Sequence, residues 1–170
     1  KDNGIYDAMN KGLKQVDGDI IGILNSDDYY YENAFSIVKE YFEKFTSIDF
    51  LFGTVKKYKL HYGYEPKKIF WTFGFYSSHS VGFFIKTVSQ KKMGQYNIKY
   101  KYSSDYDLFF RMIVKEKMNG MATQKNEIRL YLYTLLNSKI SITNYIIDFA
   151  FPVLRSWFYI PVFICLFIYA

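Results

Sequence analysis

Residues 1–45 carry apolar patterns of two different periods. In the first segment, apolar residues recur three or four positions apart, which predicts an amphipathic helix. These residues are Ile5, Ala8, Met9, Leu13 and Val16. A short β-branched run follows from Ile20 to Leu24, which favours a strand buried on both faces, as in a parallel sheet. A second helix is predicted from about Asn33 to Phe45, so the order indicates an α/β layer architecture.

The middle of the chain predicts further strands around an irregular segment. One or two strands are expected between Asp49 and Lys59, and another from Ser80 to Lys86. Between them, Leu60 to Phe75 is rich in aromatic residues and contains Pro66 and several glycines. Periodic structure is therefore not expected in that segment.

Two more helices are predicted towards the C-terminus. Apolar residues lie on one side of a helix expected from Ser103 to Lys117, with Ser104 as a candidate N-cap. The apolar residues of this side are Leu108, Phe109, Met112 and Ile113. A further helix is expected from Glu127 to Leu136.

From Ile140 onward the chain is strongly apolar, and Ser156 to Ala170 carries no charged residue. This uncharged stretch is about 15 residues, whereas spanning a bilayer takes roughly 20. It therefore suits a transmembrane helix if the chain continues, and an interfacial or re-entrant helix if it ends there. A buried core helix or an oligomer contact is the alternative. We expect an α/β unit over residues 1–137 and a hydrophobic, helical, membrane-associating tail over residues 138–170.

Composition and charge exclude several classes of protein. The chain has 170 residues and 37 aromatic residues, which is incompatible with intrinsic disorder. Cys165 is the only cysteine, so neither a disulfide scaffold nor a structural zinc site is expected. The net charge of +6 brings no nucleic-acid motif with it, and lysines beside an apolar tail favour an anionic membrane surface.

Asp27 and Asp28 directly follow the first predicted strand. Two adjacent carboxylates repel each other, so partial burial of both is costly without a cation. Hard oxygen ligands at a strand end suit Mg²⁺ or Mn²⁺ held together with a phosphate. A solvated acidic turn would explain the same residues without a ligand.

Asp105 and Asp107 lie in the first turn of the helix predicted from Ser103. A carboxylate at this place could act as a general base, although acidic residues there also simply complement the helix dipole. Arg111 lies four residues after Asp107, which is the spacing of an ordinary intrahelical ion pair. His79, before the strand at Val81, also suits a structural role.

Taken together, these segments resemble motifs of the family 2 glycosyltransferases of the GT-A fold. Four segments match the family's motifs in order and spacing: Lys1 to Gly12, Gly18 to Asp28, His79 to Phe84, and Ser104 to Arg111. The resemblance implies an α/β, Rossmann-like mixed sheet flanked by helices, incomplete at the N-terminus. It also implies that the motifs begin inside a larger domain, since the family starts with a strand and loops that hold the nucleobase.

The resemblance implies a role for each matching residue. Asp27 and Asp28 correspond to the metal and nucleotide-sugar motif, and Asp105 corresponds to the catalytic base. The donor side would be lined by Asp2, Asn10 and Gly12, while the diphosphate or acceptor would be contacted by His79 and Arg111. The implied reaction is an inverting, metal-dependent transfer from a nucleotide sugar to a glycan or lipid-linked acceptor. The lipid-linked option rests on the apolar tail, which also leads us to expect the protein at the cytoplasmic face of the membrane, either peripheral or anchored by the C-terminal segment.

Two departures and two alternatives accompany this interpretation. The family's usual acidic residue before the catalytic aspartate is Ser104 here, and the segments that bind the nucleobase are not in this sequence. We therefore expect an active parent enzyme and an inactive fragment. A non-catalytic, membrane-associated glycan-binding module is one alternative. A phosphohydrolase or nuclease using carboxylates that converge on two metals is the other.

Overall fold

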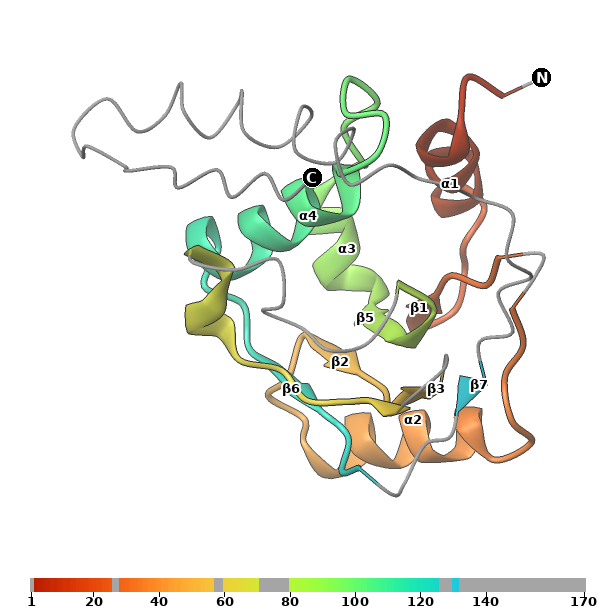
Figure 1. Cartoon of the computed structure of the whole chain (residues 1–170), viewed down its shortest axis with the longest axis vertical. Helices are drawn as coiled ribbons and strands as arrows, with labels where there is room; N and C mark the ends of the chain where they lie inside the picture. Colours follow the sequence, from red (N-terminus) through yellow and green to blue (C-terminus); the bar gives the residue numbers. More distant parts are fainter. Residues whose placement is uncertain (1, 26–27, 57–59, 71–79, 126–129, 132–170) are drawn as a thin grey trace, which may run out of the picture.

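The structure is a computed structural model, and it describes residues 2–25, 28–56, 60–70, 80–125 and 130–131. A four-stranded mixed sheet forms its centre (Figure 1). The strands are β1 (Ile20–Gly22), β5 (Phe83–Lys86), β2 (Phe50–Phe52) and β6 (Gly120–Ala122), in that order across the sheet. β5 is antiparallel to both β1 and β2, whereas β6 is parallel to β2.

The prediction of a strand at Ile20 is confirmed, but its predicted environment is wrong. β1 lies at the edge of the sheet and pairs antiparallel with β5, and of its residues only Ile21 is buried. An apolar run does not specify the direction of its neighbour, which explains the error. Gly22 is needed at the end of the strand, because a Cβ there would lie 2.7 Å from the Phe84 ring.

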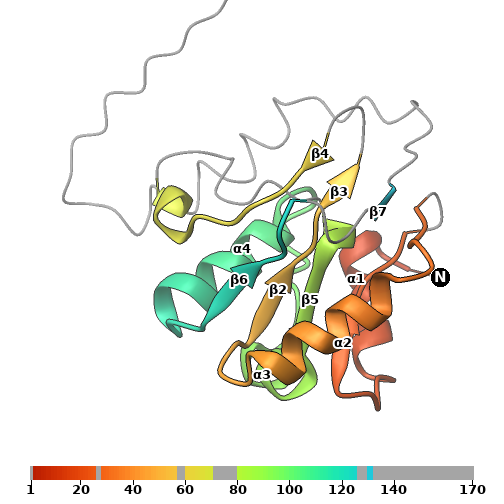
Figure 2. The same ribbon diagram turned by 90° about the horizontal axis from the view of Figure 1, so that it is seen from below.

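Four helices cover the sheet among the described residues. They are α1 (Ile5–Leu13), α2 (Ala34–Lys44), α3 (Thr87–Met93) and α4 (Ser104–Phe110), and α4 continues into a π-helical turn, Arg111–Lys115. α1 and α2 were expected from the apolar periodicity, whereas α3 was not. Figures 1 and 2 show α2 on one face of the sheet and the other three helices on the opposite face.

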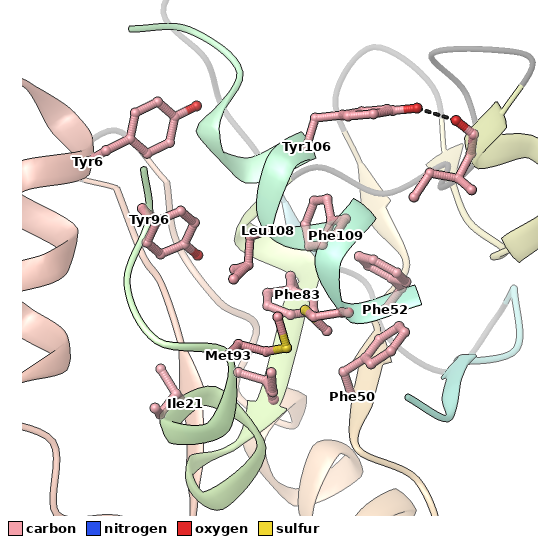
Figure 3. Packing of buried hydrophobic residues seen from close by; sticks show 13 residues of the cluster. Tyr6, Ile21, Phe50, Phe52, Phe83, Met93, Tyr96, Tyr106, Leu108 and Phe109 are labelled. Carbon is pink, nitrogen blue, oxygen red and sulfur yellow. Dashed lines mark hydrogen bonds between the residues drawn. The ribbon is translucent and has the colours of Figure 1, made fainter. Parts of the chain in front are cut away.

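Alternation along the strands divides the core into two layers. Phe50 and Phe52 point to the face of α1, α3 and α4, while Leu51 between them packs with α2. Phe83, Phe84 and Ile85 alternate in the same way. The larger layer, drawn in Figure 3, is dominated by aromatic rings, and the Phe83 and Phe109 rings meet edge to face at 4.9 Å. This layer fixes α4 against the sheet.

α4 begins one residue earlier than the predicted cap at Ser104 implies. Ser103 occupies the N-cap and its side chain makes no capping hydrogen bond, while Ser104 is already helical. Ser104 is fully buried, and its hydroxyl has no hydrogen-bond partner among the described residues. Both serines precede an acidic first turn, so the sequence pattern alone does not distinguish them.

A second, three-stranded sheet has the order β4 (Leu60–His61), β3 (Val55–Lys56) and β7 (Leu130–Tyr131). β7 contradicts the helix predicted from Glu127 to Leu136 at these two residues, because Leu130 and Tyr131 pair in parallel with β3. The rest of that predicted helix and the predicted tail, residues 138–170, lie outside the described residues. Within the described ranges, no helix has both the length and the apolar character needed to cross a bilayer.

Candidate active site

Asp105 is the second residue of α4, at the end of the helix that faces α1 (Figure 1). Its side chain is partly buried, and its Oδ1 atom accepts two hydrogen bonds. The Tyr6 hydroxyl donates one at 3.1 Å and the Tyr106 backbone N–H donates the other at 2.9 Å. Burial raises the pKa of Asp105 above its ordinary value, and these two hydrogen bonds oppose that rise.

Tyr6 is held in place by a second tyrosine. Its ring stacks on Tyr96 with centroids 5.6 Å apart and an angle of 23° between the ring planes. The buried Asn10 side chain, one turn further along α1, binds the Tyr96 backbone twice: Nδ2 donates to the carbonyl at 2.8 Å, and Oδ1 accepts from the N–H at 2.8 Å. The two rings lie next to each other in Figure 3. Asn10 therefore fixes the segment that supports Tyr6.

Arg111 connects α4 to the segment after α3. Its Nε donates to Asp107 Oδ2 at 2.9 Å, which confirms the predicted intrahelical ion pair. The other guanidinium nitrogens donate to the carbonyls of Met93 at 2.6 Å and Gln95 at 2.9 Å. These bonds hold the chain just before Tyr96, so Arg111 has a structural function here. Its predicted contact with the diphosphate or acceptor stays a prediction.

The loop after β1 places Asp28 near the C-terminal end of that strand. Asn25 Nδ2 donates to Asp28 Oδ2 at 2.8 Å, and the Asp28 N–H donates to the Asn25 carbonyl at 3.1 Å. Tyr30 anchors the loop beside the sheet, because its hydroxyl donates at 3.2 Å to the carbonyl of Val81, in the short 3-10 helix Ser80–Gly82 that precedes β5. Burial, assisted by the charge of Asp28, raises the pKa of Tyr30, so this hydroxyl stays a donor.

Asp28 is the predicted metal ligand that can be assessed, since Asp27 lies outside the described residues. Its partly exposed carboxylate is a hard oxygen donor of the kind that Mg²⁺ and Mn²⁺ prefer. Among the residues that the structure describes, no three His, Cys, Asp or Glu side chains converge in a way that could hold a metal ion. A carboxylate of this kind would suit a metal ion that also binds a ligand's phosphates, and the metal site at Asp27 and Asp28 stays a prediction.

The remaining predicted site residues lie at the start of the chain or outside the residues that the structure describes. Asp2 is exposed and forms an ion pair with Lys11 at 2.7 Å, and Lys11 also reaches Asp7 at 2.8 Å. Gly12 lies on α1 with open space where a Cβ would be. The predicted contacts of Asp2, Asn10 and Gly12 with a donor stay predictions. His79 lies outside the described residues.

The structure thus brings Asp105, Asn10 and Arg111 together around the segment from Met93 to Tyr96. Sequence reasoning missed Tyr6 and Tyr96, which complete this arrangement. Tyr6 precedes Asn10 by four residues, so the two lie on the same face of α1. This spacing indicated that Tyr6 and Asn10 share a face. A tyrosine on an amphipathic helix, however, is first interpreted as a core residue.

A comparison with known protein families agrees with the resemblance of the sequence motifs. The family model described as Glycosyl transferase family 2 matches residues 1–116, which include α1, the loop with Asp28, and Asp105 on α4. No curated protein matches the chain significantly. The mixed sheet flanked by helices fits a GT-A-like domain. Because the model covers more than half of the sequence, the chain belongs to glycosyl transferase family 2.

Proposed function

We propose that the protein transfers a sugar, with inversion at the anomeric carbon, from a nucleotide sugar to a glycan or lipid-linked acceptor. Family membership indicates glycosyltransferase activity in general, with a nucleotide-sugar donor and an acceptor. The observation that carries the finer proposal is the Asp105 carboxylate, partly buried at the start of α4 and hydrogen-bonded to Tyr6. A carboxylate in such surroundings is a stronger base than one in water.

In the proposed step, the Asp105 carboxylate takes the proton of the acceptor hydroxyl as that oxygen attacks the anomeric carbon. A new carbon–oxygen bond forms on the face opposite the leaving group. The bond between the anomeric carbon and the diphosphate oxygen breaks, and its electron pair leaves with the nucleoside diphosphate. A single displacement of this kind inverts the anomeric configuration and needs no covalent enzyme intermediate.

Asp28, with Asp27 beside it in the sequence, would hold a divalent metal, Mg²⁺ or Mn²⁺. When bound, such an ion neutralises the charge that develops on a leaving diphosphate. Asn25 contributes by orienting the Asp28 carboxylate through the 2.8 Å hydrogen bond. Tyr30 contributes by binding the segment that precedes β5, so that the carboxylate stays near the end of β1.

The contacts of the two helical carboxylates favour this proposal over a two-metal phosphohydrolase. Asp105 is bound by Tyr6, whereas Asp107 is bound by Arg111 on the same helix. Two carboxylates with such different partners are poorly placed to share a metal ion. No observation on the described residues favours the glycan-binding module.

A transfer assay tests the proposed function. The full-length protein is incubated with a panel of nucleotide sugars, Mn²⁺ or Mg²⁺, and glycan or lipid-linked acceptors, and the anomeric configuration of the product is read by NMR. We expect inversion, loss of transfer with a chelator, and loss of transfer in Asp105→Asn. Glu43→Gln, which removes an exposed carboxylate on α2, serves as the matched control. Retention of configuration, or full activity without metal, would contradict the proposal.

Membrane association belongs to the same proposal. It rests on the uncharged, apolar sequence from Ser156 to Ala170 and on the net charge of +6. We expect the full-length protein to lie at the cytoplasmic face of the membrane. It should sediment with membranes and need detergent for release. Complete recovery in the soluble fraction without detergent would contradict membrane association.

A further inference from the structure

Two neighbouring residues in the described part of the chain bind the same oxygen of the Asp105 carboxylate. Both the Tyr6 hydroxyl and the Tyr106 N–H donate to Oδ1, and neither of these bonds uses Oδ2. The Tyr106 bond joins neighbouring residues of the same helix and does not depend on how other elements pack. The Tyr6 bond joins residues 99 positions apart in the sequence and requires α1 to dock beside α4.

Tyr6 is itself rigidly supported. Its side chain is buried with 9% of its surface exposed, and its ring stacks on Tyr96. The Tyr96 backbone is fixed by two hydrogen bonds to Asn10, and the preceding residues are fixed by Arg111. A hydroxyl mounted in this way has little freedom to follow the carboxylate, so the carboxylate must orient to the hydroxyl.

We propose that Tyr6 is the positioning residue of this glycosyltransferase: its hydroxyl fixes Oδ1 of Asp105 so that Oδ2 receives the proton of the acceptor. This inference rests on the proposed function, because it assumes that Asp105 is the base. Tyr6 acts through Asp105 and does not take part in the bond changes. Tyr6, which lies in the N-terminal motif from Lys1 to Gly12, thus has a role beyond packing.

The same hydrogen bond sets the protonation of Asp105. A donor to the charged form favours ionisation, so Tyr6 opposes the rise in the pKa of Asp105 that burial causes. Among the described residues, the charge of Asp105 also acts on Tyr96, before α4, and the charge of Arg111 acts on Tyr96 in the opposite direction. Burial raises the pKa of Tyr96, so Tyr96 is neutral at physiological pH and Tyr6 is the group to change.

The test is Tyr6→Phe, which keeps the ring stacked on Tyr96 and removes the hydroxyl. We expect kcat to fall roughly tenfold or more with KM nearly unchanged, because orientation of the base is lost. We also expect the acidic limb of the pH–rate profile to move up by roughly one pH unit, as a hydrogen bond to the charged form is removed. Tyr64→Phe removes a hydroxyl from a tyrosine packed against the same core layer and is the matched control.

A second readout does not depend on activity. The carboxyl carbon of Asp105 is titrated by NMR in the wild type and in Tyr6→Phe, with Asp105→Asn used to assign the signal. A higher pKa of Asp105 in Tyr6→Phe supports the inference. An unchanged titration, together with an unchanged pH–rate profile, would overturn it. Full transfer by Asp105→Asn would instead refute Asp105 as the base, which separates the two failures.

Discussion

Partial burial of the Asp105 carboxylate lowers the stability of the folded protein at neutral pH. Its pKa is raised chiefly by desolvation, so the folded state binds a proton at this site more tightly than the unfolded state does. Between the unfolded pKa of 3.8 and the higher folded pKa, stability therefore falls as the pH rises. Above the folded pKa the whole penalty is present. Strain of this kind at a base is typical of functional sites.

Asp105→Asn should therefore stabilise the fold at neutral pH while removing the base. Asparagine keeps an Oδ1 acceptor for Tyr6 and for the Tyr106 N–H, but carries no charge to desolvate. Urea unfolding at pH 7 should give a higher free energy of unfolding for the variant than for the wild type. The difference should shrink at a pH below 3.8, where both side chains are neutral. A variant less stable than the wild type at pH 7 would contradict this explanation.

At the scale of the element, α1 acts as a support for α4. Its contacts run from Tyr6 to Asp105 and from Asn10 to the backbone of Tyr96. α1 is short, nine residues, and isolated helices of this length are marginal in water. Its docking therefore depends on these tertiary contacts and on the apolar residues that pack against the larger core layer.

Asn10→Ala tests this support directly. The substitution leaves the buried N–H and carbonyl of Tyr96 without their partners, and each unsatisfied group costs about 1–3 kcal/mol. We expect the free energy of unfolding to fall by about 3 kcal/mol in urea titration. Asn3→Ala, on an exposed side chain, should change it little. An equal effect of both substitutions would show that the contact between α1 and Tyr96 contributes nothing specific.

Gly12→Ala separates a structural glycine from a functional one. Nothing lies within 4 Å of the position a Cβ would take, and Gly12 is helical, so alanine should stabilise α1 by about 0.5–1 kcal/mol. If the donor approaches this residue closely, the same methyl group should raise the KM for the nucleotide sugar. Thermal unfolding and donor kinetics measure the two effects. Unchanged donor kinetics would remove Gly12 from the donor side.

At the scale of the molecule, helices pack on both faces of a mixed sheet, and most of this layout could be predicted from periodicity. α1, α2 and the hydrophobic face of α4 carry clear apolar patterns. α3 does not, because it buries the polar side chains of Thr87, Ser89 and Gln90. The Thr87 hydroxyl donates to the Gly18 carbonyl, and the Ser89 hydroxyl donates to Asp49 at 2.7 Å. Hydrogen bonds that satisfy buried polar groups are invisible to a hydrophobic pattern.

β6 and β7 escaped prediction for a related reason. Each is very short and gains its partner from a strand far away in the sequence, β2 and β3 respectively. Gly120 begins β6 because the Phe50 ring occupies the position that a Cβ would take. The residues of the candidate site also differ in whether the sequence alone could identify them. Asp105 and Arg111 were identifiable from motifs, whereas Tyr6 and Tyr96 gain their meaning only from the docking of α1 beside α4.

Gly120→Ala tests how tightly the sheet and the aromatic layer are packed. The added methyl group meets the Phe50 ring, so the ring or β6 must shift, and overpacking of this kind typically costs about 1–3 kcal/mol. Urea unfolding should show the loss. Gly120→Ala should lower the free energy of unfolding less in a Phe50→Leu protein than in the wild type, because the smaller side chain leaves room for the methyl group. Full stability of the single variant would show that this contact is loose.

The central claim is that Asp105 is the base of a sugar transfer. The most direct test is the transfer rate of the full-length Asp105→Asn protein, measured at saturating donor and acceptor with the metal present. The account predicts a fall of roughly a hundredfold to ten-thousandfold in kcat, with the affinity for the nucleotide sugar nearly unchanged. A rate within a few-fold of the wild type, with folding intact, would contradict it.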